Sequence, residues 1–172
     1  SWKRAWSEPW EWREIVQVGL LCVDASQAFA ALDGVEVLVR PQRNPELSEY
    51  FQSLTGISQD RLVREGRSLF EAMADMQALM SGIDMVIFNG YDGQILRENC
   101  ALLGCEYPWP HVPAYNFRPL LSAVLNHPSE ELVSSALPIL AGVENIGQAH
   151  TALDDCRAIA AALGKWRLSV VL

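Results

Sequence analysis

The sequence predicts an α/β fold, and three stretches of it carry that prediction. Residues Glu14 to Val23 form an apolar, β-branched run with few polar interruptions, which is typical of a strand covered on both faces. Residues Leu69 to Met80 repeat apolar side chains at helical spacing and follow Ser68, a suitable N-cap. Asp84 to Phe88 has the pattern of a short buried strand, and the chain then turns into a helix from about Gly93 to Leu103.

Length and composition indicate a single domain. The 172 residues are 50% hydrophobic, which is enough for one sizeable core and too little chain for two ordinary domains. We therefore expect one globular domain over residues 1–172, with a tryptophan-rich loop over 1–12 and a folded body over 13–172. No apolar run approaches ~18 residues and no signal-peptide pattern is present, so we expect a soluble, cytoplasmic protein.

The early elements follow from turn residues between apolar runs. A second strand, Val35 to Val39, ends before Pro41 and can pair with the first as an antiparallel hairpin. Asp24 to Asp33 supplies the turn between them. Glu46 to Leu54 has the pattern of a short helix among turn signals.

The last third of the chain is mainly helical in pattern. Tyr115 to Leu125 is an apolar run, and Ser129 to Leu140 has helical spacing that Pro138 should bend or end. A final helix is expected from about Ala152 to Leu163, capped by Gly164.

Charge and cysteine content exclude some classes of function. A net charge of −8 argues against a broad basic surface for nucleic acid, since such binding needs many lysines and arginines. It does not exclude a metal-dependent nuclease, because bound cations would dominate the local field. The four cysteines have no CxxC spacing, so we expect reduced, partly buried thiols.

The strongest chemical signal lies ahead of the final helix. His150-Thr151-Ala152-Leu153-Asp154-Asp155 places a histidine and an acidic pair at a helix entry. An imidazole can take a proton near neutrality because its unperturbed pKa is ~6.5. An aspartate at the helix entry can ligate a divalent cation. Taken alone, the hexapeptide is explained equally well by an exposed histidine and a favourable helix N-terminal charge.

Three other segments accompany that signal in a fixed order. Arg13 to Gly19 reads R-E-I-V-Q-V-G, Pro45 to Ser48 reads P-E-L-S and is followed by L-T-G-I, and Asp92 follows a strand and Tyr91. An aspartate in that position is usually only a helix cap. Together with the H-x-A-x-x-D pattern of His150 and Asp155, the four segments resemble the motifs of the DEDDh (DnaQ-like) 3′–5′ exonuclease superfamily. The P-x-L-S and L-T-G-I element resembles that of its Eri-type subgroup.

One motif of this family is absent from the sequence. The family carries an Asp-x-Glu pair, two of its four metal ligands, on a first strand ahead of the strand that here begins at Glu14. The only nearby carboxylates ahead of that strand are Glu8, Glu11 and Glu14, and nothing places them opposite Asp92 and Asp155. Either the chain is truncated ahead of Ser1 or it is a naturally degenerate member. The intact second strand and the other motifs favour truncation.

The resemblance implies an RNase H-like α/β fold with a mixed five-stranded sheet flanked by helices, here lacking the first strand. It implies two Mg²⁺ or Mn²⁺ ions per complete site, with Asp92 and Asp155 as ligands and His150 as the general base. Tyr91 would stack on a base of single-stranded RNA or DNA at its 3′ end, and nucleoside 5′-monophosphates would be released. With only two of the four carboxylates, the chain as given is expected to be weakly active or inactive.

Other functions stay open from the sequence. A non-catalytic module that binds nucleic acid or protein could keep this fold without metal chemistry. The retained His150 and Asp155 argue against it, since a scaffold has no need of that pair. An unrelated small α/β domain with accidental motifs is a third interpretation. Aromatic residues that could be exposed are compatible with a homodimer.

Overall fold

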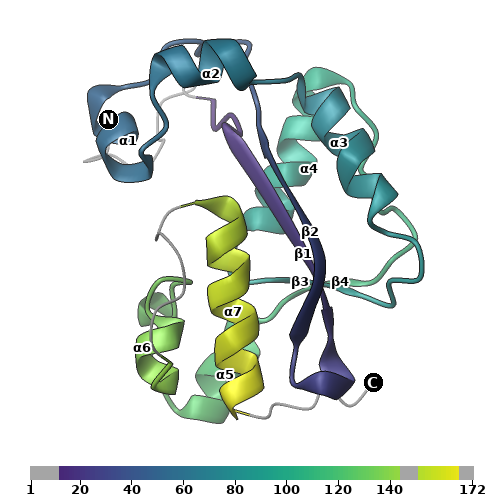
Figure 1. Ribbon diagram of the computed structural model, residues 1–172, viewed down its shortest axis with the longest axis vertical. Helices are drawn as coiled ribbons and strands as arrows, with labels where there is room; N and C mark the ends of the chain where they lie inside the picture. Colours follow the sequence, from purple (N-terminus) through teal and green to yellow (C-terminus); the bar gives the residue numbers. More distant parts are fainter. Residues whose placement is uncertain (1–11, 144–150, 167–172) are drawn as a thin grey trace.

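The computed structural model describes residues 12–143 and 151–166. A long hairpin of two strands, β1 (Gln17–Asp24) and β2 (Ala30–Leu38), runs through the molecule, with α3 on one side and α7 on the other (Figure 1). The fold class is α/β, as the sequence predicts, and the expected antiparallel hairpin is confirmed.

The turn of this hairpin is tighter than expected. Strand β2 begins at Ala30, inside the predicted turn, because Ala28 and Phe29 take left-handed φ angles of 53° and 59° and reverse the chain at once. Phe29 is buried, so its side chain anchors this turn in the core. A bulge between Cys22 and Val23 adjusts the register near the same end.

A second strand pair completes the β-structure that the described residues contain. Strand β3 (Val86–Phe88) pairs in parallel with β4 (Ala114–Asn116). Residues 12–143 and 151–166 thus show four strands in two separate pairs, β1–β2 and β3–β4, where one mixed sheet of the five-stranded type, lacking its first strand, was expected. One pair is antiparallel and the other is parallel. Within these residues, β1 and β3 each keep one edge without a strand partner.

The two pairs nevertheless lie in one layer between helices. Side chains alternate along β1, so that Val18 enters one buried cluster while Leu21 packs against another. The same alternation holds on β3, where Val86 belongs to the first cluster and Ile87 packs against the second. One set of helices therefore covers one face of both pairs, and a second set covers the other.

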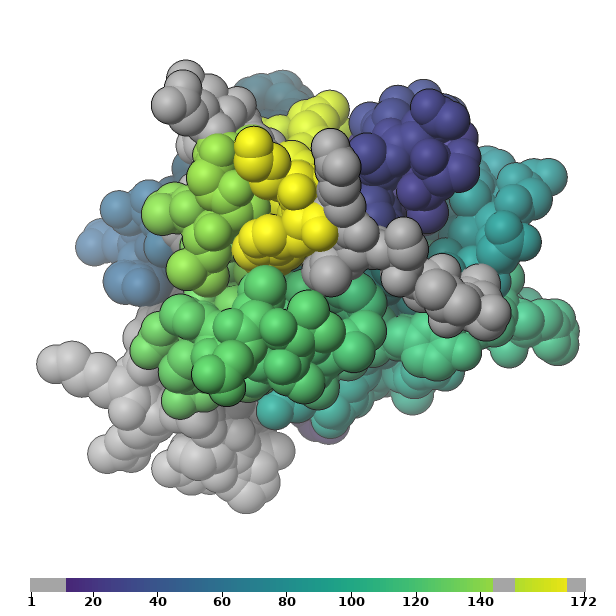
Figure 2. Space-filling view, turned by 90° about the horizontal axis from the view of Figure 1, so that it is seen from below, coloured from purple at the N-terminus to yellow at the C-terminus, as the bar shows by residue number. Residues whose placement is uncertain are grey.

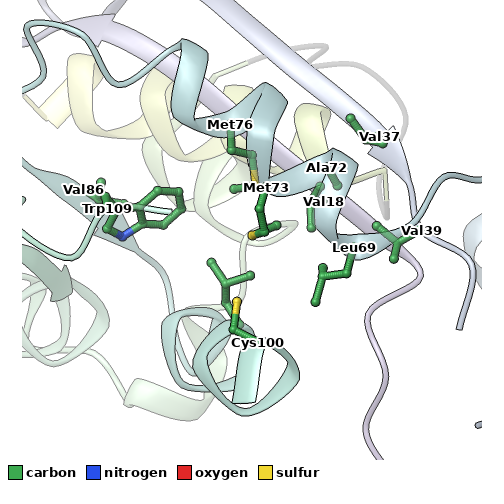
Figure 3. Packing of buried hydrophobic residues seen from close by; sticks show 11 residues of the cluster. Val18, Val37, Val39, Leu69, Ala72, Met73, Met76, Val86, Cys100 and Trp109 are labelled. Atoms are coloured by element: carbon green, nitrogen blue, oxygen red, sulfur yellow. The ribbon is translucent and has the colours of Figure 1, made fainter. Parts of the chain in front are cut away.

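Helices α3 and α4 cover the first face. Their buried side chains include Met73 and Met76 of α3 and Cys100 of α4, which points toward α3 in Figure 3. Trp109, from the connector after α4, lies beside Val86 in the same cluster. The methionines are core residues, as their helical spacing indicates.

Helices α5, α6 and α7 cover the second face, and their packed ends lie beside the tip of the β1–β2 hairpin (Figure 2). No described helix is long and apolar enough to cross a membrane. The helices are α1 (Glu49–Thr55), α2 (Gln59–Glu65), α3 (Leu69–Ala78), α4 (Asp92–Leu103), α5 (Arg118–Leu125), α6 (Leu137–Ala141) and α7 (Ala152–Trp166), with 3₁₀ turns at Ala25–Gln27 and Ser129–Glu131.

Two predicted helices differ from the structure. The expected helix from Ser129 to Leu140 is wrong: a 3₁₀ turn and a connector precede α6, in which Pro138 occupies the first turn, where a proline is tolerated. The final helix does not end at Gly164 but runs to Trp166. A Cβ on Gly164 would lie 2.3 Å from the carbonyl oxygen of Ala28, so the glycine is needed for close packing and not as a cap.

Candidate metal and nucleic-acid site

The loop after β3 carries the first group of site residues. Gly90 has a φ of 123°, and its N–H donates to the Asn116 side chain at the end of β4, at 3.0 Å. The carboxyl ends of these two parallel strands thus meet, and Asp92 opens α4 directly beyond them. Tyr91 is 68% exposed at this point, so its ring is accessible from solvent.

The entry of α7 is held by the hairpin. The Oε1 atom of Gln17 accepts from the N–H of Ala152 at 3.0 Å, and Oε2 of Glu36 accepts from the N–H of Leu153 at 2.9 Å. These two side chains satisfy helix N-terminal donors that would otherwise lack intrahelical partners. The backbone also comes close, because a Cβ on Gly19 would lie 2.5 Å from the carbonyl carbon of Ala152.

The charges of three carboxylates reach one thiol at this entry. Burial is the main cause that raises the pKa of Cys156 to about 12; the negative charges of Asp155, Asp92 and Glu36 contribute to this value, in that order, and the positive charge of Arg157 opposes them. The thiol lies 3.6 Å from the carbonyl oxygen of Gly19, so it is fixed against β1. The aspartates that the sequence singled out, from helices α4 and α7, therefore both lie within electrostatic range of this thiol.

The Asp92 carboxyl is partly desolvated. Loss of hydration raises its pKa, and the positive charge of Arg118 lowers it again. A cation close to a partly desolvated carboxylate stabilises its charged form, because the attraction to the cation replaces the lost hydration. A nearby cation would therefore stabilise the charged form of Asp92.

The remaining residues named from the sequence are His150 and the glutamates near the first strand. His150 lies outside the described residues, as do Glu8 and Glu11. Glu14 is engaged elsewhere: its carboxylate accepts from the backbone N–H groups of Gln42, Arg43 and Asn44 at 2.7–3.1 Å. It is not oriented as a partner for Asp92 and Asp155, in agreement with the sequence prediction.

The described residues supply two carboxylates near one another and not a complete metal site. Asp92 and Asp155 converge and bring the hard oxygen ligands that Mg²⁺ and Mn²⁺ prefer. Across residues 12–143 and 151–166, no group of three or more acidic, histidine or cysteine side chains is arranged to hold a metal ion. Further ligands are needed to complete the site.

Sequence reasoning missed Gln17, Glu36, Cys156 and Arg118. Gln17 lies inside the R-E-I-V-Q-V-G strand, so the motif itself carried a signal for it. Arg118 comes two residues after the last residue of β4, and polar residues after a strand end are typical of α/β sites. All four cysteines are free thiols, as expected.

Comparisons with known proteins bear on the family and the fold. The family model described as Exonuclease, of the RNase T type, matches residues 10–163. No curated protein matches the chain.

Solved structures with a similar fold include a full-length 3′-exonuclease, at a TM-score of 0.77 and 22% identity over 91% of this chain and 73% of that one. The nuclease domain of 3′hExo, described as a DEDDh family member bound to rAMP, matches at a TM-score of 0.76 and 22% identity over 88% and 79%. A 3′-exonuclease that recognises the histone mRNA stem-loop matches at 0.80 and 21% over 93% and 58%. At these identities the likeness shows the fold.

Proposed function

This chain belongs to the RNase T exonuclease family, and from that premise we propose that it is the body of a DEDDh-type 3′–5′ exonuclease domain acting on the 3′ ends of single-stranded RNA or DNA. The observation that supports this most directly is the convergence of Asp92 and Asp155 around Cys156. These carboxylates open two different helices, 63 residues apart, and a scaffold has no need to bring such charges together.

Each side chain has one role in this proposal. Asp92 and Asp155 hold Mg²⁺ or Mn²⁺, and His150 takes the proton of the attacking water as general base. When bound, a metal pair supplies Lewis-acid activation and charge neutralisation for phosphodiester hydrolysis. Tyr91 stacks on a terminal base, and nucleoside 5′-monophosphates leave as products. The Eri-type subgroup is part of the same proposal.

The 172-residue polypeptide is proposed to be weakly active or inactive by itself. It supplies two of the four family carboxylates, and ligands that act on one metal pair are strongly non-additive. A longer polypeptide that includes an upstream Asp-x-Glu strand would have a complete set.

The test is digestion of 5′-labelled single-stranded RNA and DNA with Mg²⁺ or Mn²⁺, comparing this polypeptide with one extended ahead of Ser1. We expect shortening from the 3′ end, much faster for the extended form, and abolished by Asp92→Asn, Asp155→Asn and His150→Ala. Asp154→Asn is the matched control, because Asp154 adjoins Asp155 but pairs with Arg157 at 2.7 Å. Degradation from the 5′ end, or rates unchanged by Asp155→Asn, would refute the proposal.

A non-catalytic binding module is the second candidate. It is favoured by the incomplete set of carboxylates and by Trp12, which is 42% exposed with the Arg43 guanidinium 4.7 Å from its ring centre. This alternative predicts equal binding of a single strand in EDTA and in Mg²⁺, and no digestion even by the extended polypeptide.

A further inference from the structure

Arg118 lies at the junction of the two strand ends that shape the site. It is the first residue of α5, separated from β4 only by Phe117, and its guanidinium reaches back to the loop after β3. Its Nη2 donates to the backbone oxygen of Asn89 at 2.6 Å, and its Nε donates to the Asn89 side-chain oxygen at 3.3 Å. The side chain is therefore fixed in direction.

The loop is built to admit this guanidinium. A Cβ on Gly90 would lie 2.7 Å from Nη2 of Arg118, and the φ of Gly90 also favours glycine. Asn89 is itself buried and donates to the backbone oxygen of Leu132 at 2.9 Å, so the acceptor of Arg118 is anchored. The arginine thus lies on a rigid support beside Tyr91 and Asp92.

The charge of Arg118 is not neutralised by a carboxylate partner. Arg118 takes part in none of the ion pairs found within residues 12–143 and 151–166. Within the same residues its Nη1 makes no hydrogen bond. Its positive charge nevertheless lowers the pKa of Asp92, against the larger opposite effect of burial. A half-buried, fixed positive charge therefore lies at the edge of an acidic cluster in a chain of net charge −8.

We propose that Arg118 binds a phosphate of the nucleic-acid strand and so determines how the strand enters the site, an inference that rests on the proposed function. A guanidinium offers a planar fork of donors that matches phosphate oxygens, and it remains charged at any working pH. The exposed Tyr91 ring follows Gly90, against which Arg118 packs, and would receive the base of a nucleotide whose phosphate Arg118 holds. The acidic surface elsewhere makes one well-placed cation important for an anionic strand.

The test measures binding as a function of salt. A fluorescein-labelled single-stranded RNA of ten nucleotides, with a phosphorothioate as its last linkage, is titrated by fluorescence anisotropy at fixed Mg²⁺ and increasing KCl. Wild-type protein is compared with Arg118→Gln, Arg118→Lys and Arg61→Gln. The last is a matched control: Arg61 pairs with Glu65 at 2.9 Å on α2, at the other end of the hairpin in Figure 1.

We expect Arg118→Gln to weaken binding about tenfold and to reduce the log–log salt slope by ~0.7, as for one lost phosphate contact on a single strand. Arg118→Lys should keep the slope and lose part of the affinity, because lysine keeps the charge without the fork. Arg61→Gln should change neither.

Two results would overturn the inference. If Arg118→Gln has the same salt slope as wild type, whatever its affinity, Arg118 does not contact a phosphate and only holds Asn89 in place. If Arg118→Lys reduces the salt slope as much as Arg118→Gln does, the reduction comes from the lost contacts to Asn89 and not from the lost charge. If wild-type protein fails to bind the strand under any condition, the proposed function fails, and this inference fails with it.

Discussion

Gly19 lies under the first turn of α7 and has no room for a side chain. The nearest backbone atoms of Ala152 and Leu153 would be 2.5–2.7 Å from an added Cβ, which is far inside van der Waals contact. Backbone atoms cannot rotate away as the end of a flexible side chain can. A single methyl group here would therefore move the helix that carries Asp155.

The substitution Gly19→Ala is accordingly expected to lower the free energy of unfolding by roughly 2 kcal/mol, in the range of overpacked cores. Urea denaturation followed by circular dichroism measures this loss. Gly34→Ala is the comparison, because a Cβ there meets its nearest neighbour at 3.1 Å and should be tolerated better. Equal stability of Gly19→Ala and wild type would mean that α7 adjusts its position freely.

At this scale the sequence was informative where chemistry is local. The positions of Asp92 and Asp155 in the first turns of two helices could be predicted, because each stands in a short motif at a helix entry. Glu36 could not, since its role is to accept from Leu153, a residue 117 positions later. Arg118 was equally hidden, because its partner Asn89 belongs to another strand end.

Among the helices, α3 shows most clearly how local sequence fixes a boundary. Ser68 and Glu71 form a reciprocal capping box, in which each side chain accepts from the other residue's backbone N–H. This is why the start of α3 was predicted correctly. Turns without such residues were not: Ala28 and Phe29 take left-handed angles that nothing in their side chains requires.

The capping box predicts a pH dependence of stability. Hydrogen bonds from the Ser68 hydroxyl and backbone lower the pKa of Glu71. Because its folded-state pKa is depressed, its contribution to stability is present above the unfolded value of ~4.3 and is lost as the pH falls through the folded value. The stability difference between wild type and Glu71→Gln should therefore be positive at neutral pH and vanish in acid. Chemical denaturation across that range measures it, and a constant difference would contradict the assignment.

The whole molecule combines two strand pairs in one layer with helices on both faces. Burial on two faces explains why β1 could be predicted from its apolar run, since alternate side chains enter different clusters. The split into pairs could not be predicted from local pattern, because pairing depends on which strands become neighbours. Among residues 12–143 and 151–166, β1 and β3 each have one edge without a strand neighbour, where an added strand could pair with the backbone.

A synthetic extended peptide with an Asp-x-Glu pair between apolar residues is therefore expected to raise the unfolding temperature of this polypeptide and, with Mg²⁺, its digestion of single-stranded RNA. The same peptide with Asn-x-Gln should stabilise the protein without activating it. A scrambled peptide is the control for non-specific effects. No change with either designed peptide, by thermal unfolding and by digestion, would show that the two edges do not accept a strand.

Helix α7 touches the same hairpin at both of its ends. Gln17 and Glu36 bind its first turn, and Gly164, near its last turn, packs against the carbonyl oxygen of Ala28 at the hairpin tip. Neither element can open without releasing the other. In native-state hydrogen exchange, α7 and the β1–β2 hairpin would therefore behave as a single cooperative foldon, and the amides of both should exchange with one common opening free energy.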